Sequence, residues 1–207
     1  THVICHEFCS EFAELMADNV SGLQCVMQTK NDILLFPSSG SGGLEAAIVN
    51  LLSPGDKVLA VNMGVFSQRM GQIAHNFGAS VTWIEIQWGT AVTAADYRAV
   101  LENDNKHEYK AVFVTHNETA TGVIVDIESV RRMLDELKHP ALLVVDAVSS
   151  LAIADLQTDA WRVDVVVSAS QKGLMLPGGL SVISVSPEAW EAHNKATMPK
   201  WYWNFSN

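Results

Sequence analysis

The feature that most constrains the fold is a series of short, continuous apolar runs that alternate with stretches of helical spacing. Such runs are typical of strands buried on both faces, as in a parallel sheet covered by helices. Between two of them, the stretch from Phe66 to Phe77 has apolar residues at helical spacing and closes at Gly78. We therefore predict an α/β fold, in which a mainly parallel sheet is sandwiched by helices. The predicted strands are 57–62, 81–86, 111–115, 142–145, 163–167 and 180–185. The predicted helices are 6–20, 66–77, 94–101, one that follows a loop within residues 40–52, and one that starts at Asp126.

Composition limits the classes of partner. The chain has 207 residues, of which 48% are hydrophobic and 17% charged, which indicates a globular protein. The net charge is −10, from 13 basic and 23 acidic residues, and it disfavours nucleic acid or an anionic membrane surface as partner. No apolar run approaches the roughly 20 residues that span a bilayer. We expect neither a nucleic-acid nor a membrane partner.

The cysteines indicate a compartment and raise the question of a metal. The three cysteines, Cys5, Cys9 and Cys25, are an odd and low number, which fits a reducing compartment better than a disulfide scaffold. We expect a cytoplasmic protein, with an organelle such as the peroxisome as the alternative. His2 and His6 lie close to Cys5 and Cys9, but the spacing is not that of a standard zinc site and fits the start of a helix as well. We predict no metal.

Polar residues follow the ends of several predicted strands. Asp146 comes directly after the run 142–145, and Lys172 comes shortly after the run 163–167. In open α/β sheets, ligands bind beyond the carboxyl ends of the strands, so we expect these side chains to share one crevice. A lysine there is expected to be buried, which would ease loss of its proton and make it a nucleophile. Taken alone, Asp146 could equally cap the turn that follows it.

A loop rich in Gly and Ser, residues 38–43, precedes a predicted helix. Glycine lets the backbone approach an anion closely, and a helix N-terminus offers unpaired N–H groups to a phosphate. The loop is neither a Walker loop nor a GxGxxG motif, and it could also be a simple connector. An anion cradle, a buried carboxylate and a buried amine, in that order, are what pyridoxal phosphate requires.

Four ordered motifs, at 39–47, 116–123, 146–151 and 170–174, resemble the class V aminotransferases of the fold-type-I pyridoxal-phosphate enzymes. The resemblance covers nearly the whole chain and is greatest to the alanine/serine–glyoxylate branch. It implies an enzyme that moves an amino group from a small amino acid, alanine or serine, to glyoxylate or pyruvate. It also implies pyridoxal 5′-phosphate as cofactor and a homodimer.

The resemblance further implies roles for single residues. Lys172 would hold the cofactor as a Schiff base and then shuttle the alpha proton of the substrate, while Asp146 would pair with the pyridinium nitrogen. Val148 would press on one face of the ring. Phe66, which periodicity alone could also place in the core, would stack on the other. Thr119 would bond near the ring hydroxyl, and Ser41, Gly42, Gly43 and Gln171 would line the phosphate site.

The chain also departs from the family pattern. Ala120 stands where a serine is usual, Gly178 where a second proline is frequent, and the start lacks the expected His-Arg, so the substrate stays open. Family members continue past residues 201–204 into a small domain that supplies the arginine for the substrate carboxylate. We therefore expect residues 1–207 to be most of the PLP-binding large domain, with the C-terminal small domain absent from this chain.

Two alternatives remain open. One is another class V enzyme, such as a cysteine desulfurase, which has a His before the lysine and a reactive Cys in a later loop. Here Gln171 precedes Lys172, and the cysteines lie near the start. The other is a cofactor-domain fragment that does not turn over substrate.

Overall fold

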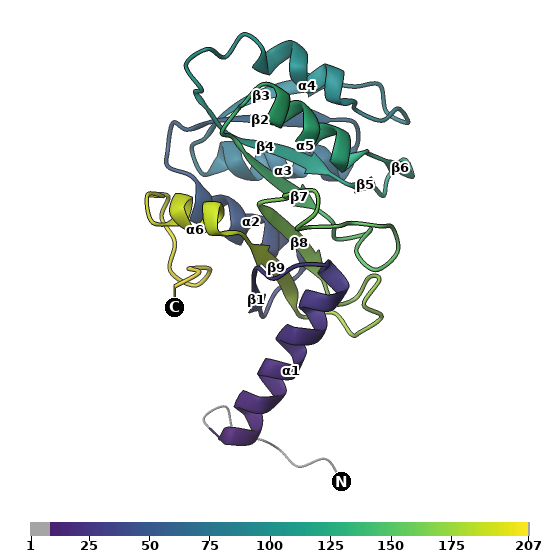
Figure 1. The fold of residues 1–207 in the computed structure, drawn as a ribbon, viewed down its shortest axis with the longest axis vertical. Coiled ribbons are helices and arrows are strands. Elements are labelled where there is room, and N and C mark those ends of the chain that lie inside the picture. The colour runs from purple at the N-terminus through teal and green to yellow at the C-terminus, as the bar shows by residue number, and fades with distance from the viewer. Residues whose placement is uncertain (1–8, 207) are drawn as a thin grey trace.

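A seven-stranded sheet forms the centre of the molecule (Figure 1). The computed structural model describes residues 9–206. The strands, in spatial order, are β1 (Asp32–Phe36), β9 (Ser181–Val185), β8 (Val165–Ala169), β7 (Leu142–Asp146), β4 (Tyr109–Thr115), β2 (Lys57–Asn62) and β3 (Ser80–Glu85).

Strand direction confirms the mainly parallel prediction. The pairs β2–β3, β2–β4, β4–β7 and β7–β8 are parallel, whereas β9 is antiparallel to both β8 and β1. Strand β1 was not predicted. The apolar pattern did not reveal the reversed direction of β9 either, because a strand buried on both faces reads the same in both directions.

Helices cover both faces of the sheet. Helices α2 (Gly40–Leu51), α3 (Val65–Asn76) and α6 (Pro187–His193) pack on one face, and α4 (Ala94–Leu101) and α5 (Ile127–Glu136) on the other. Alternation along β2 shows why both faces are apolar. Val58 and Ala60 contribute to one core cluster, and Leu59 and Val61 to the other.

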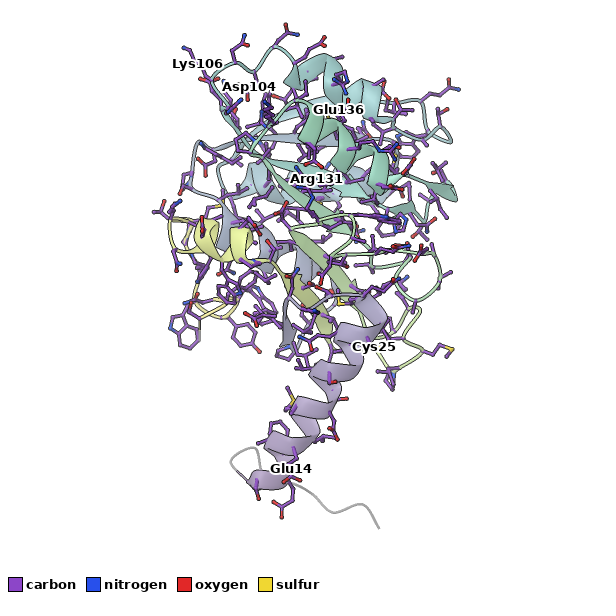
Figure 2. The ribbon with its side chains drawn as sticks, in the orientation of Figure 1. Glu14, Cys25, Asp104, Lys106, Arg131 and Glu136 are labelled. Carbon is purple, nitrogen blue, oxygen red and sulfur yellow. The ribbon has the colours of Figure 1, made fainter. Side chains whose placement is uncertain are left out.

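Helix α1 (Ser10–Met27) extends away from the sheet, with Glu14 near its far end and Cys25 near the body (Figures 1 and 2). It is longer than the predicted 6–20. Met27 is its buried residue, and the side chain of Leu15 is 52% exposed. Of the four residues weighed for a metal, His2, Cys5 and His6 lie outside the described residues, and Cys9 is a free cysteine. Within residues 9–206, no helix is long and apolar enough to cross a membrane.

Two local features shape the edge of the sheet where the site lies. The polar stretch after β4 folds into a small hairpin, β5 (Asn117–Glu118) and β6 (Val123–Ile124). The Gly/Ser stretch is not a loop throughout, because α2 already begins at Gly40, so Gly40–Gly43 form the first turn of the helix. The expected anion cradle is therefore a helix N-terminus itself.

Candidate active site

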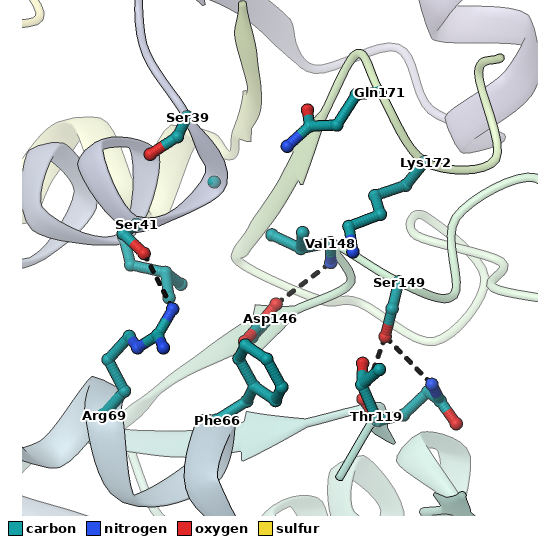
Figure 3. A pocket seen from close by; sticks show the side chains of 13 residues that line it. Ser39, Ser41, Phe66, Arg69, Thr119, Asp146, Val148, Ser149, Gln171 and Lys172 are labelled. Atoms are coloured by element: carbon teal, nitrogen blue, oxygen red, sulfur yellow. Dashed lines mark hydrogen bonds between the residues drawn. The ribbon is translucent and has the colours of Figure 1, made fainter. Parts of the chain in front are cut away.

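A cavity of about 240 Å³ opens beyond the carboxyl ends of β4, β7 and β8, the edge at which the sequence placed the crevice (Figure 3). Because ligands bind at this edge of parallel sheets, the cavity is the candidate site. The residues that line it are Ser39, Gly40, Ser41, Leu44, Phe66, Arg69, Asn117, Thr119, Asp146, Val148, Ser149, Gln171 and Lys172.

The N-terminus of α2 forms one wall. Ser39 is the N-cap residue, and its hydroxyl makes no capping bond to the first turn. The first N–H groups of a helix have no intrahelical partner, so this end suits an anion. Gly40 has no room for a side chain, since a Cβ would lie 2.6 Å from Cγ2 of Val148. The glycine thus allows the helix end to approach the wall formed by Val148.

Asp146 ends β7 at the floor of the cavity and is only 5% exposed. The backbone N–H of Val148 donates to its Oδ1 at 2.9 Å. Burial raises the pKa of Asp146 to about 6; the charge of Glu118 also raises it, while the Val148 bond, Arg69 and Lys172 act to lower it. A buried carboxylate with one such bond suits a cationic N–H donor as partner.

Phe66 and Val148 both line the cavity and are half-buried. Phe66 is the second residue of α3, and the guanidinium carbon of Arg69 lies 4.7 Å from the centroid of its ring. Arg69 also donates from Nη1 to Oγ of Ser41 at 2.9 Å, which ties α3 to the first turn of α2. Phe66 is therefore a wall of the cavity, and it belongs to neither of the two hydrophobic core clusters.

Lys172 lies in the turn after β8, and its side chain points into the cavity toward Val148 and Ser149 (Figure 3). The expectation that it is buried is wrong, because Lys172 and Gln171 are exposed. The physical reason is that the segment 175–180, which follows in the same loop, also lies at the surface, so no layer of chain covers the lysine.

The structure brings together seven of the nine predicted site residues. Gly42 and Gly43 do not line the cavity, although both belong to the first turn of α2. A Cβ on Gly42 would meet Oγ of Ser38 at 1.9 Å, and one on Gly43 would meet Cβ of Ser181 at 2.8 Å. These glycines make room for close packing of α2. The seven that line the cavity are Ser41, Phe66, Thr119, Asp146, Val148, Gln171 and Lys172.

Sequence reasoning missed four polar members of the lining: Ser39, Arg69, Asn117 and Ser149. Three of them lie inside the motifs already recognised, and Arg69 follows Phe66 by one helical turn, so the spacing could have revealed it. Asn117 and Ser149 hold each other. The side-chain amide nitrogen of Asn117 donates to Oγ of Ser149 at 2.9 Å. The Ser149 hydroxyl in turn donates to the backbone carbonyl oxygen of Asn117 at 3.0 Å.

The sequence profile of the family described as "Aminotransferase class-V" matches residues 1–199. The chain belongs to the class V aminotransferase family. It is 46% identical, over 93% of its length, to an L-aspartate–glyoxylate aminotransferase of Paracoccus denitrificans, and spans 49% of that protein. It is 49% identical, over 76% of its length, to a serine–glyoxylate aminotransferase of Hyphomicrobium methylovorum, and spans 39% of it.

A crystal structure of an alanine–glyoxylate aminotransferase from a Nostoc species superposes with a TM-score of 0.91 at 32% identity. The match covers 99% of this chain and 54% of that one. The class V chain thus spans between 39% and 54% of the length of these relatives.

These findings confirm the family and the fold class that the motifs implied. Class V aminotransferases are pyridoxal-phosphate enzymes, so the expected cofactor is that of the family. Among residues 9–206, no group of three or more His, Cys, Asp or Glu side chains is arranged to hold a metal ion.

Proposed function

We propose that the protein carrying this chain is a pyridoxal-phosphate-dependent aminotransferase that transfers an amino group from a small amino acid, alanine or serine, to glyoxylate or pyruvate. The observation that carries the proposal is one cavity that combines an inward-pointing amine, a buried carboxylate and an uncapped helix N-terminus. The three relatives described above, whose names all include glyoxylate, support this acceptor.

The donor set of the cavity fits the cofactor group by group. The first turn of α2, with Ser41 and Gln171, would hold the phosphate, because N–H, hydroxyl and amide groups suit an anion. Asp146 would accept a hydrogen bond from the protonated ring nitrogen, which gives its buried carboxylate the cationic partner that the protein supplies only weakly. Phe66 and Val148 would pack on the ring, and Thr119 would bond near the ring hydroxyl.

When bound, pyridoxal phosphate supplies an electron sink that stabilises negative charge at the alpha carbon of the substrate. Lys172 would attach the cofactor through Nζ and, once released by the amino substrate, Nζ would take and return the alpha proton. Asp146 keeps a negative charge beside the ring nitrogen and so holds the proton there. The walls formed by Phe66 and Val148 keep the reacting groups in a fixed orientation.

We also propose that residues 1–207 form most of the PLP-binding large domain, with the small domain outside this chain. Support comes from the relatives, of which the chain spans about half. Limited proteolysis of the full-length protein should leave a stable core that contains these residues. Early cleavage inside the central strands would contradict this division.

A homodimer and a cytoplasmic location complete the proposal. Exposed apolar side chains support a dimer: Trp201 is 80% and Tyr202 60% exposed, and exposed apolar surface often marks a protein–protein interface. Three cysteines support a reducing compartment. Sedimentation that gives a monomer mass, or recovery of the protein in an organelle fraction, would refute these two points.

The activity is tested by incubating the full-length protein and pyridoxal phosphate with glyoxylate and L-serine, L-alanine or L-aspartate, and measuring glycine. Wild type should form glycine, and Lys172→Ala should form none. Lys195→Ala, which removes an exposed lysine outside the cavity, is the matched control and should behave as wild type. The proposal fails if wild type forms no glycine with either L-serine or L-alanine, or if Lys172→Ala remains active.

A further inference from the structure

Glu118 is a fully buried carboxylate, 0% exposed, that does not itself line the cavity. It ends β5, directly before Thr119, and its carboxylate lies against the first turn of α3. Burying a carboxylate is unfavourable unless hydrogen bonds compensate. The groups that donate hydrogen bonds to Glu118 therefore indicate its structural role.

Three backbone N–H groups donate to this carboxylate. Ser67 donates to Oε2 at 2.8 Å, Phe66 to Oε2 at 3.1 Å, and Ala120 to Oε1 at 3.1 Å. Phe66 and Ser67 lie at the N-terminus of α3, where a negative charge is favourable and N–H groups lack partners. Glu118 thus caps a helix that begins more than fifty residues earlier in the chain.

Gly64 leaves room for this contact. A Cβ on Gly64 would lie 2.3 Å from Cδ of Glu118, so any side chain there would displace the carboxylate. The φ angle of Gly64 is 167°, which is extended backbone that other residues also adopt. The glycine is therefore required by the close approach of Glu118 and not by the conformation of the turn.

The hydrogen bonds of Glu118 connect it to two residues that line the cavity, Phe66 and Thr119. Phe66 is bonded directly, and Thr119 is held between Glu118 itself and the bonded N–H of Ala120. We propose that Glu118 is a positioning residue of the active site, whose carboxylate sets Phe66 and Thr119 in place for the cofactor ring. This inference rests on the function proposed above and names a residue that the motifs did not assign.

A purely structural cap would serve α3 without affecting the chemistry of the site, so the two roles must be separated. The charge of Glu118 also acts on Asp146 and raises its pKa. The other charged groups that act on Asp146 are Arg69 from α3 and Lys172 from the turn after β8, and both act in the opposite direction. Loss of the Glu118 charge should therefore lower the pKa of Asp146.

The experiment is a titration of the full-length apo-protein with pyridoxal phosphate, over a range of pH, for wild type and Glu118→Gln. The substitution keeps the shape but removes the charge and one acceptor. Near pH 8 we expect the Kd to rise about tenfold, the scale of one hydrogen bond to a charged group. In wild type, binding should weaken as Asp146 takes up a proton below about pH 6. In Glu118→Gln this acid limb of the binding curve, the pH range in which the Kd rises, should move to lower pH.

Asp164→Asn is the matched control. Asp164 is also a buried carboxylate that accepts a backbone N–H bond, from Leu143 at 2.7 Å, but it lies at the opposite edge of the sheet, just before β8. Its Kd for pyridoxal phosphate should stay within about twofold of wild type, because loss of one distant charge changes no contact at the cavity. Circular dichroism establishes that each variant is folded before titration.

Gly64→Ala is the second variant, because it displaces the Glu118 carboxylate without removing its charge. It should weaken binding near pH 8 while leaving the acid limb closer to that of wild type. A Kd within about twofold of wild type in both variants, or an acid limb that does not move in Glu118→Gln, would overturn the proposal. Loss of folding in both would assign Glu118 to the fold and overturn it as well. Failure of wild type to bind pyridoxal phosphate would instead refute the proposed function, and the role of Glu118 with it.

Discussion

Replacing Asp146 by Asn should stabilise the apo-protein at neutral pH while it weakens cofactor binding. Asp146 is 5% exposed, and burial raises its pKa from 3.8 to about 6. The folded apo-protein therefore holds the proton more tightly than the unfolded chain does. The contribution of this bound proton to the free energy of unfolding is fully present below about pH 3.8. It is lost as the pH rises through about 6.

The size of the effect follows from the two pKa values. At 1.36 kcal/mol per pKa unit, the rise from 3.8 to about 6 lowers the free energy of unfolding by about 3 kcal/mol once Asp146 is ionised. Asn avoids this cost, and its amide oxygen can still accept the Val148 N–H bond. With the cofactor bound this gain is partly or wholly offset, because the charge-assisted bond to the ring nitrogen, worth roughly 1.5–3 kcal/mol, is lost.

The assay is urea unfolding of the full-length apo-protein at fixed concentration, for wild type and Asp146→Asn. The variant should be more stable by about 3 kcal/mol near pH 7.5 and by about 1 kcal/mol near pH 4.5. Its Kd for pyridoxal phosphate should rise tenfold or more.

Asp126→Asn is a control of opposite sign. Its bonds to Ser129 lower the pKa of Asp126, so this variant should lose stability near pH 7.5. An apo Asp146→Asn protein less stable than wild type near pH 7.5, or an equal difference at both pH values, would refute the reasoning.

Three further predictions concern other parts of the structure. Borohydride reduction of the protein with pyridoxal phosphate should place the label on the peptide that contains Lys172, and a label elsewhere would show that the site assignment is wrong. Gly40→Ala should weaken cofactor binding without unfolding the protein, because the added Cβ displaces Val148; an unchanged Kd would contradict this. Tyr97→Phe should lower the free energy of unfolding by about 1 kcal/mol, because the buried Tyr97 hydroxyl donates to the Phe113 carbonyl at 3.1 Å, and should leave the Kd unchanged; urea unfolding and titration check both.

Several features could be predicted because they depend on local pattern. The position of Asp146 at the end of an apolar run placed it at the carboxyl edge of the sheet, and the structure has it there. The spacing after Asp126 predicted a capped helix, and its carboxylate accepts the N–H of Ser129 at 3.0 Å. Local patterns succeed here because strand ends and helix caps are decided within a few residues.

By itself, then, the sequence determined the alternation of strands and helices, the family and the group of polar residues that follow the strands. The tertiary structure alone decided that β9 runs antiparallel, that Lys172 is exposed, that Arg69 reaches Ser41 and that Glu118 lies beneath Phe66. Such contacts join segments far apart in the chain, and their geometry depends on how helices pack on the sheet. Burial periodicity records that a residue is covered, but it carries no information about which distant residue covers it.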